Sequence, residues 1–231
     1  MVGDFMTKKL NWTVRITFVL YLVYVYLTVY RLNSFYSFLL LNTFLAYIPI
    51  EISMHLKAKQ PKLLYWGLFI LWLLFYPNAP YVITDLFHLA RMNPYDPLNG
   101  LMSFNLHKWL NFTNLVTSAF TCSIVGTWSL EHVAQTLQAR FKLRGWGARN
   151  LLVLILTLAS SIGIYVGRFL RLHTAYLFLE PDAVVKQLIE MWSPRMLIFV
   201  IFMTIIQLSI WAAMTIGRLL INQYDQQNNL L

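Results

Sequence analysis

Residues 63–88 read LLYWGLFILWLLFYPNAPYVITDLFH, and this stretch decides the fold. No charged residue occurs in it before Asp85. An apolar run of about 18 residues or more with few charges predicts a helix that crosses a membrane. Pro77 and Pro80 each lack a backbone N–H, and Pro80 disfavours helical geometry at Ala79. We therefore expect this membrane helix to be broken near its end.

Similar apolar runs occur along the whole chain of 231 residues. Hydrophobic residues make up 58% of it and charged residues only 12%, about half the charged fraction of an ordinary soluble domain. Six stretches are long enough to span a bilayer, at about residues 12–30, 35–54, 63–88, 109–130, 150–170 and 196–217. The sequence therefore predicts an all-α, polytopic membrane helix bundle that forms one integral domain over residues 1–231.

Basic residues lie mainly near the ends of these stretches, and the net charge is +9. Long basic side chains reach the membrane interface, where anionic headgroups attract them, so we expect membrane lipids as partners and not nucleic acid. More of the 18 Lys and Arg residues fall on the side that holds both termini. This excess predicts cytoplasmic N- and C-termini, and it turns the broken end of the third span outward.

The break is followed by two ionisable residues, Asp85 and His88, that share one face of a helix. Arg168 and Arg171 have the same spacing at the outward end of the fifth span, at about the same height in the bilayer. We therefore predict an outward-facing polar site in which Asp85 and His88 act as a general base and its orienting partner. The residues predicted to bind the ligand are Asn78, Tyr81, Arg168, Arg171 and His173. No spacing resembles a metal-binding motif, so no metal site is predicted, and the cofactor is left open.

Three functions fit these residues. Arginine side chains offer a fork of donors suited to phosphate, so the site could bind or process a lipid or a lipid-linked phosphate. The alternative is a transporter or carrier of an anionic substrate, because broken helices hold such substrates in membrane proteins. In the third interpretation Asp85 and an arginine form an ion pair that only pins two helix ends, in an accessory membrane protein. Glu51, near Pro49 in the second span, is a second candidate functional residue.

Residues 181–193 follow a different pattern from the apolar spans. Pro181 and Asp182 are typical of the first turn of a helix, and Val184, Leu188 and Trp192 then fall on one face. This pattern predicts an amphipathic helix that lies on the outer surface and covers the polar site.

Two motifs resemble the signatures of an uncharacterised family of bacterial integral membrane proteins, the domain of unknown function 1361. The first is Pro77-Asn78-Ala79-Pro80-Tyr81 followed by Thr84-Asp85 and His88, and the second runs from Gly163 through Gly167-Arg168 to Arg171. The resemblance covers most of the chain from about the second span onward. It implies a multi-pass protein of the bacterial plasma membrane and no known reaction. Family members follow the second arginine with an Asn-Ser-Trp-Asp-like stretch, whereas this chain has Leu172-His173-Thr174-Ala175-Tyr176, which implies a variant site.

Overall fold

The computed structural model describes residues 8–31, 35–96, 100–170 and 181–228. Within these ranges every named element is a helix, and β structure is limited to an isolated antiparallel bridge between Tyr95 and Met102. The prediction of an all-α membrane helix bundle is therefore confirmed. The chain divides into two compact units, Met1–Val133 and Ala134–Leu231, which we describe one at a time. That the two form a single integral domain stays a prediction.

Five helical stretches in the described part of the chain are long and apolar enough to cross a membrane. They are Lys8–Tyr30, Phe35–His55, Lys62–Met92, Trp146–Leu170 and Pro194–Gln227. Each contains one of the expected spans. The remaining expected span, residues 109–130, lies within helix α5 (Leu106–Arg140), which is long enough but is not among these five. Polar side chains along α5 lower its mean hydropathy, and several of them are buried, including Asn114, Ser118, Ser123, Thr127 and Ser129.

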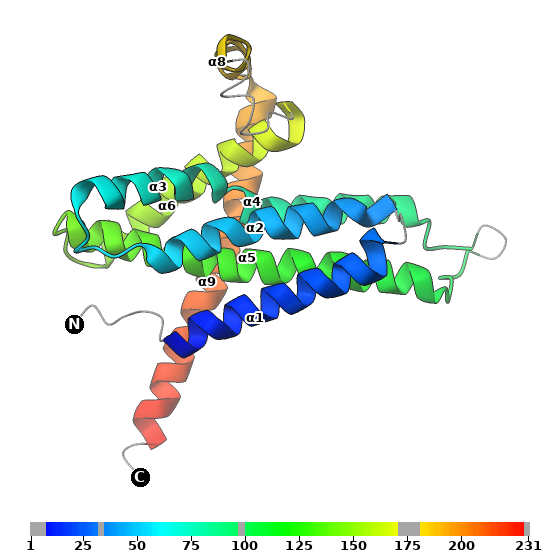
Figure 1. Cartoon of the computed structure of the whole chain (residues 1–231), viewed down its shortest axis with the longest axis horizontal. Helices are drawn as coiled ribbons and strands as arrows, with labels where there is room; N and C mark the ends of the chain where they lie inside the picture. Colours follow the sequence, from blue (N-terminus) through cyan, green and yellow to red (C-terminus); the bar gives the residue numbers. More distant parts are fainter. Residues whose placement is uncertain (1–7, 32–34, 97–99, 171–180, 229–231) are drawn as a thin grey trace. The chain divides into compact units, whose positions relative to one another are not determined.

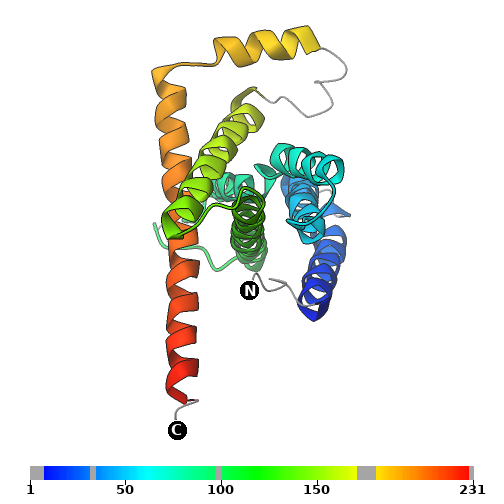
Figure 2. The ribbon, with the colours of Figure 1, turned by 90° about the vertical axis from the view of Figure 1, so that its left-hand side faces the viewer.

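Unit 1 is built from four long helical segments and their connections. The first is α1 (Lys8–Val25), which ends in a π-helical turn (Tyr26–Tyr30), and the second is α2 (Phe38–His55), which follows the short helix η2 (Phe35–Ser37). The third is the interrupted segment made of α3 (Lys62–Phe75), α4 (Asn78–Tyr81) and η3 (Val82–Met92). The fourth is most of α5. Figure 1 shows α1, α2 and α5 running beside one another, and Figure 2 shows the same helices nearly end-on. Each helix satisfies its own backbone hydrogen bonds, and side-chain packing then joins neighbouring helices in a membrane protein.

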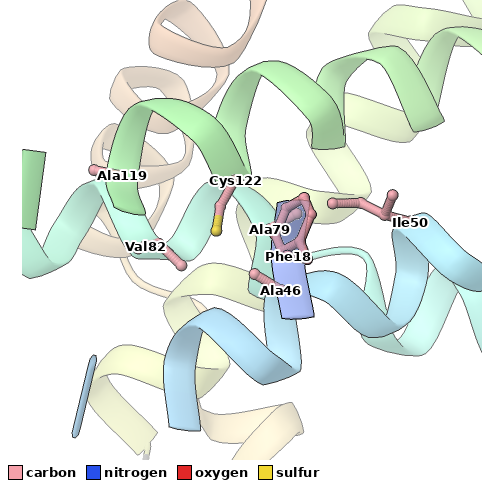
Figure 3. Close-up of a cluster of buried hydrophobic side chains, with 7 residues drawn as sticks. All are labelled: Phe18, Ala46, Ile50, Ala79, Val82, Ala119 and Cys122. Carbon is pink, nitrogen blue, oxygen red and sulfur yellow. The ribbon is translucent and has the colours of Figure 1, made fainter. Parts of the chain in front are cut away.

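Buried side chains from every one of these segments meet in one cluster (Figure 3). It contains Phe18, Ala46, Ile50, Ala79, Val82, Ala119 and Cys122. Polar contacts add to this apolar packing: the Thr43 and Ser118 hydroxyls are 2.7 Å apart, and Trp72 Nε1 donates to Ser129 Oγ at 2.9 Å. Ser118 and Ser129 of α5 are therefore partners for the helices around it, which helps to explain how a helix of modest hydropathy is accommodated in a membrane protein.

Unit 2 contains α6 (Trp146–Tyr165) with its π-helical end η4 (Val166–Leu170), α8 (Pro181–Glu190) and α9 (Pro194–Asn228). A buried polar contact joins α6 to α9: the Ser161 and Thr204 hydroxyls are 3.0 Å apart, and Gln207 Nε2 donates to Ser161 Oγ at 2.9 Å. Hydroxyl and amide groups commonly join membrane helices in this way.

Helix α8 lies in the segment where the sequence predicts a surface helix. Its Val184 is 3% exposed, and Leu188 packs against a buried cluster of Met191, Met196 and Val200. Trp192 is 55% exposed and lies beyond the end of α8 at Glu190. That residues 181–193 lie on the outer surface and cover the polar site stays a prediction.

Candidate functional site

The break in the third segment satisfies its own backbone groups. Because Pro80 has no N–H, the Tyr76 carbonyl would lose its α-helical donor; Ala79 N–H donates to it instead, at 3.0 Å. That shift leaves the Phe75 carbonyl without its usual donor, and Asn78 Nδ2 donates to it at 2.9 Å. Tyr81 N–H donates to the Pro77 carbonyl at 3.0 Å. The Asn78 amide and these backbone donors hold a compact turn, not an unwound gap with amides aimed into it.

The turn also packs closely against α5. Ala79 is fully buried, and a Cβ atom placed on Gly126 would lie 2.7 Å from the Ala79 Cβ. Contacts that short essentially do not occur between real Cβ atoms, so the approach of α4 to α5 requires glycine at position 126.

The segment that follows the turn, η3, is a 3₁₀ helix of 11 residues. Runs of more than 3 or 4 residues in this conformation are uncommon, and its period of 3.0 residues per turn stacks side chains at i and i+3 above one another. Val82, Asp85, His88 and Arg91 are therefore aligned in one column along η3. Val82 belongs to the buried cluster of Figure 3, and Arg91 at the other end is exposed. The column leads from the core of unit 1 to its surface.

Asp85 is the buried charged group of this column, with 1% of its surface exposed. Asn42 Nδ2, from α2, donates to Asp85 Oδ2 at 2.7 Å. This contact links η3 to α2 and satisfies one carboxylate oxygen with a short hydrogen bond. A buried carboxylate in a membrane-spanning segment is costly and often marks a functional site.

His88 is held in one orientation above Asp85. Its Nδ1 lies 3.0 Å from the Asp85 carbonyl oxygen and 4.0 Å from carboxylate Oδ1. A carbonyl oxygen can only accept, so this contact assigns a proton to Nδ1. The imidazole lies on the Phe38 ring, with centroids 4.4 Å apart, and its side chain is 23% exposed. His88 is thus fixed between a buried acid and the surface.

Arg91 completes the column at its exposed end. Its guanidinium carbon lies 4.7 Å from the centre of the Phe35 ring, a cation–π contact. Phe35 also lies 6.1 Å from the His88 ring, so Phe35 contacts both the imidazole and the guanidinium. The aromatic rings of Phe35 and Phe38 therefore orient the His88 and Arg91 side chains.

An apolar pocket of about 260 Å³ lies at the same end of unit 1. Leu89 and Met92 of η3 line one side of it, and Trp109 and Phe112 of α5 line another. Lys108 is at its edge, where Nζ donates to the Asn93 carbonyl at 2.8 Å. The surface end of η3 therefore combines cationic groups with an apolar hollow.

The predicted site residues fall into three groups. Asp85, His88, Asn78 and Tyr81 are in unit 1, although Asn78 already serves the turn through its amide. Arg168 is in η4 of unit 2, so its pairing with Asp85 stays a prediction. Arg171 and His173 lie outside the described residues.

Two residues of the site are absent from the sequence-based prediction. Asn42 is a single amide within an apolar helix, and a polar residue in such a setting is a signal in itself. Arg91 extends the spacing of Asp85 and His88 by three more residues, a pattern that fits a 3₁₀ helix and not an α-helix. Both residues can be noticed in the sequence, but only the structure shows that Asn42 contacts Asp85 and that Arg91 lines up with His88.

The second candidate, Glu51, has a separate and densely bonded environment. Arg15 Nη2 and Nε donate to its two carboxylate oxygens at 2.6 and 3.0 Å, and Tyr47 Oη donates to Oε2 at 2.6 Å. His55 Nε2 lies 3.0 Å from Oε1. Three partners on α1 and α2 therefore fix this carboxylate, which gives it a clear role in joining the two helices.

Comparisons with known proteins agree with the motifs at the break and at Arg168. No curated protein and no solved structure matches the chain. A family model described as a protein of unknown function, DUF1361, matches residues 41–210 and so includes Asn42, the turn, the whole column and Arg168. The chain therefore belongs to the DUF1361 family.

Proposed function

We propose that this chain is a multi-pass protein of the bacterial plasma membrane that binds a phosphate-headed lipid at the outward end of unit 1. The observation that carries the proposal is the column of Asp85, His88 and Arg91 on η3, with the acid buried and the guanidinium exposed. Arginine and a protonated imidazole both donate to phosphate oxygens, and charge-assisted hydrogen bonds of this kind are among the strongest in proteins. Asp85 is the residue that positions His88: its carboxylate accepts a hydrogen bond from Asn42 of α2, and this contact holds η3, which carries His88, against α2.

The apolar pocket beside the column favours a lipid over a free anion. A headgroup held by His88 and Arg91 would leave its chain within reach of the hollow lined by Leu89, Met92 and Phe112. Phe87, which is 79% exposed on another face of η3, gives this end of the protein an apolar surface suited to the bilayer.

An anion carrier would use the break differently, and the turn does not favour that use. Transporters with broken helices bind anions through free amides at the start of a half-helix. Here the Ala79 and Tyr81 amides and the Asn78 side chain donate to carbonyls of the turn itself. Lipid binding by side chains of η3 therefore accounts for more of the observed contacts than anion binding by the break.

The test measures lipid retained by the purified full-length protein. Total phosphorus and mass spectrometry of extracted lipid are compared for the parent, His88→Gln and Arg91→Gln. Loss of one charge-assisted hydrogen bond is worth about 1.5–3 kcal/mol, so affinity should fall about tenfold or more in each variant. Lys186→Gln is the matched control, because Lys186 is an exposed cation on α8 of unit 2. Equal lipid retention in all four proteins would disprove the proposal.

Orientation is tested independently by labelling. In a Cys122→Ser background, a cysteine introduced at position 228 should be shielded from an impermeant thiol reagent in intact cells, because both termini are proposed to be cytoplasmic. Cys122 is buried, so its replacement by serine removes the background thiol with little change in volume. Labelling of position 228 before lysis would place the column on the cytoplasmic side instead.

A further inference from the structure

A second pocket lies in unit 1, where α1 and α3 begin and α2 ends. It has a volume of about 530 Å³. Polar groups in its lining come from Asn11 and Arg15 on α1, His55 at the end of α2, and Lys57 and Gln60 in the following loop, and we call these residues the polar wall. Met54 of α2 and Leu64 and Leu68 of α3 add apolar side chains. The lining therefore combines basic and polar groups with apolar ones, and the pocket lies away from the η3 column.

The polar wall is held in place before any ligand arrives. Gln60 clamps the loop, because its Oε1 accepts from Lys57 N–H at 3.0 Å and its Nε2 donates to the His55 carbonyl at 2.8 Å. Glu51 fixes Arg15 and His55 through the contacts described above. Pre-organised groups lose little entropy on binding, which favours a specific ligand.

One polar atom in this wall lacks a protein partner. Asn11 Oδ1 is buried, and no hydrogen-bond donor reaches it in the part of the chain that the structure describes. With almost no accessible surface, this oxygen is not within reach of a ligand in the pocket.

The apolar side chains of the lining continue along α3 as a stripe. Leu64 and Leu71 are 50% and 48% exposed, and Leu68 lies between them at helical spacing. The stripe rises about 10 Å from the pocket along the helix. An acyl chain could lie on it while its headgroup occupies the polar wall.

We propose that this pocket binds one molecule of an anionic glycerophospholipid. The phosphate contacts Lys57, and one acyl chain follows Leu64, Leu68 and Leu71. Charge complementarity supports this occupant, because Lys8, Lys9, Lys57, Lys59 and Lys62 belong to the same end of unit 1.

The experiment titrates phosphatidylglycerol into the full-length protein in detergent and counts bound lipid by native mass spectrometry. Arg91→Gln protein is used throughout, so that the site on η3 does not contribute and failure of one proposal leaves the other standing. We expect Lys57→Gln to weaken phosphatidylglycerol binding about tenfold. Lys59→Gln is the matched control, since Lys59 is an exposed lysine of the same loop that does not line the pocket; it should change binding less than about twofold.

Two results would overturn the proposal. Equal weakening by Lys57→Gln and Lys59→Gln would show diffuse attraction to a basic surface and not a site. Equally tight binding of phosphatidylcholine with the same acyl chains would show that the polar wall does not select the headgroup. Thermal unfolding of each variant is followed by tryptophan fluorescence, and an unchanged midpoint shows that the fold is intact.

Discussion

Exchanging Asn42 and Asp85 separates the structural from the functional role of the buried carboxylate. Asp85→Ala removes the acceptor of the 2.7 Å hydrogen bond from Asn42 and leaves that amide without this contact. Loss of a hydrogen bond to a charged group, 1% exposed in this case, costs about 1.5–3 kcal/mol of the free energy of unfolding. Asp85→Asn keeps an oxygen at nearly the same place, so it should cost about 1 kcal/mol.

The double variant Asn42→Asp, Asp85→Asn keeps one amide and one carboxylate in contact but moves the charge from η3 to α2. Unfolding is measured by titration with a denaturing detergent, followed by tryptophan fluorescence, and retained lipid is measured on the same preparations. We expect the double variant to be about 1–2 kcal/mol more stable than the summed effects of Asn42→Asp and Asp85→Asn would give, and to remain deficient in lipid. Additive single changes would show that the contact contributes nothing, and full recovery of lipid would show that the position of the charge beneath His88 does not matter.

Two further predictions concern packing. Gly126→Ala should lower the free energy of unfolding by about 1–3 kcal/mol, because the new Cβ would meet the Ala79 Cβ at 2.7 Å. Gly67→Ala is the control: a Cβ there has nothing within 4 Å, so stability should be unchanged or raised. Equal effects of the two changes in the same detergent titration would contradict the close approach of α4 and α5. Val184→Ala should destabilise unit 2 by about 1–2 kcal/mol and Val185→Ala by less than about 0.5 kcal/mol, since the two side chains are 3% and 54% exposed. The reverse order in thermal melts would mean that the faces of α8 are misassigned.

The sequence predicted the break in the third segment because proline chemistry is local. Two missing N–H groups and the constraint on Ala79 act within a few residues, so the turn at Pro77–Pro80 follows without knowledge of the fold. The shared face of Asp85 and His88 follows in the same way, since a spacing of three brings side chains together in both α and 3₁₀ helices.

The rest of the site depends on contacts between distant parts of the chain. Asn42 precedes Asp85 by 43 residues, and no periodicity connects them. The alignment of Arg91 with Asp85 and His88 requires the 3₁₀ conformation, and only the structure shows that residues 82–92 adopt it. Hydropathy likewise cannot show that the polar residues of α5 have partners: Ser118 meets Thr43 and Ser129 meets Trp72 only after the helices have packed.

The winding of η3 has a mechanical consequence. From Val82 to Arg91 a 3₁₀ helix makes three full turns, so the two side chains point the same way, whereas an α-helix would turn them about 180° apart and shorten the segment by about 5 Å. In the 3₁₀ helix the carboxylate, imidazole and guanidinium therefore line up on one side, whereas in an α-helix they would point in different directions around the axis. Rewinding this single segment would therefore dismantle the column, and anything that binds His88 and Arg91 together stabilises the 3₁₀ conformation.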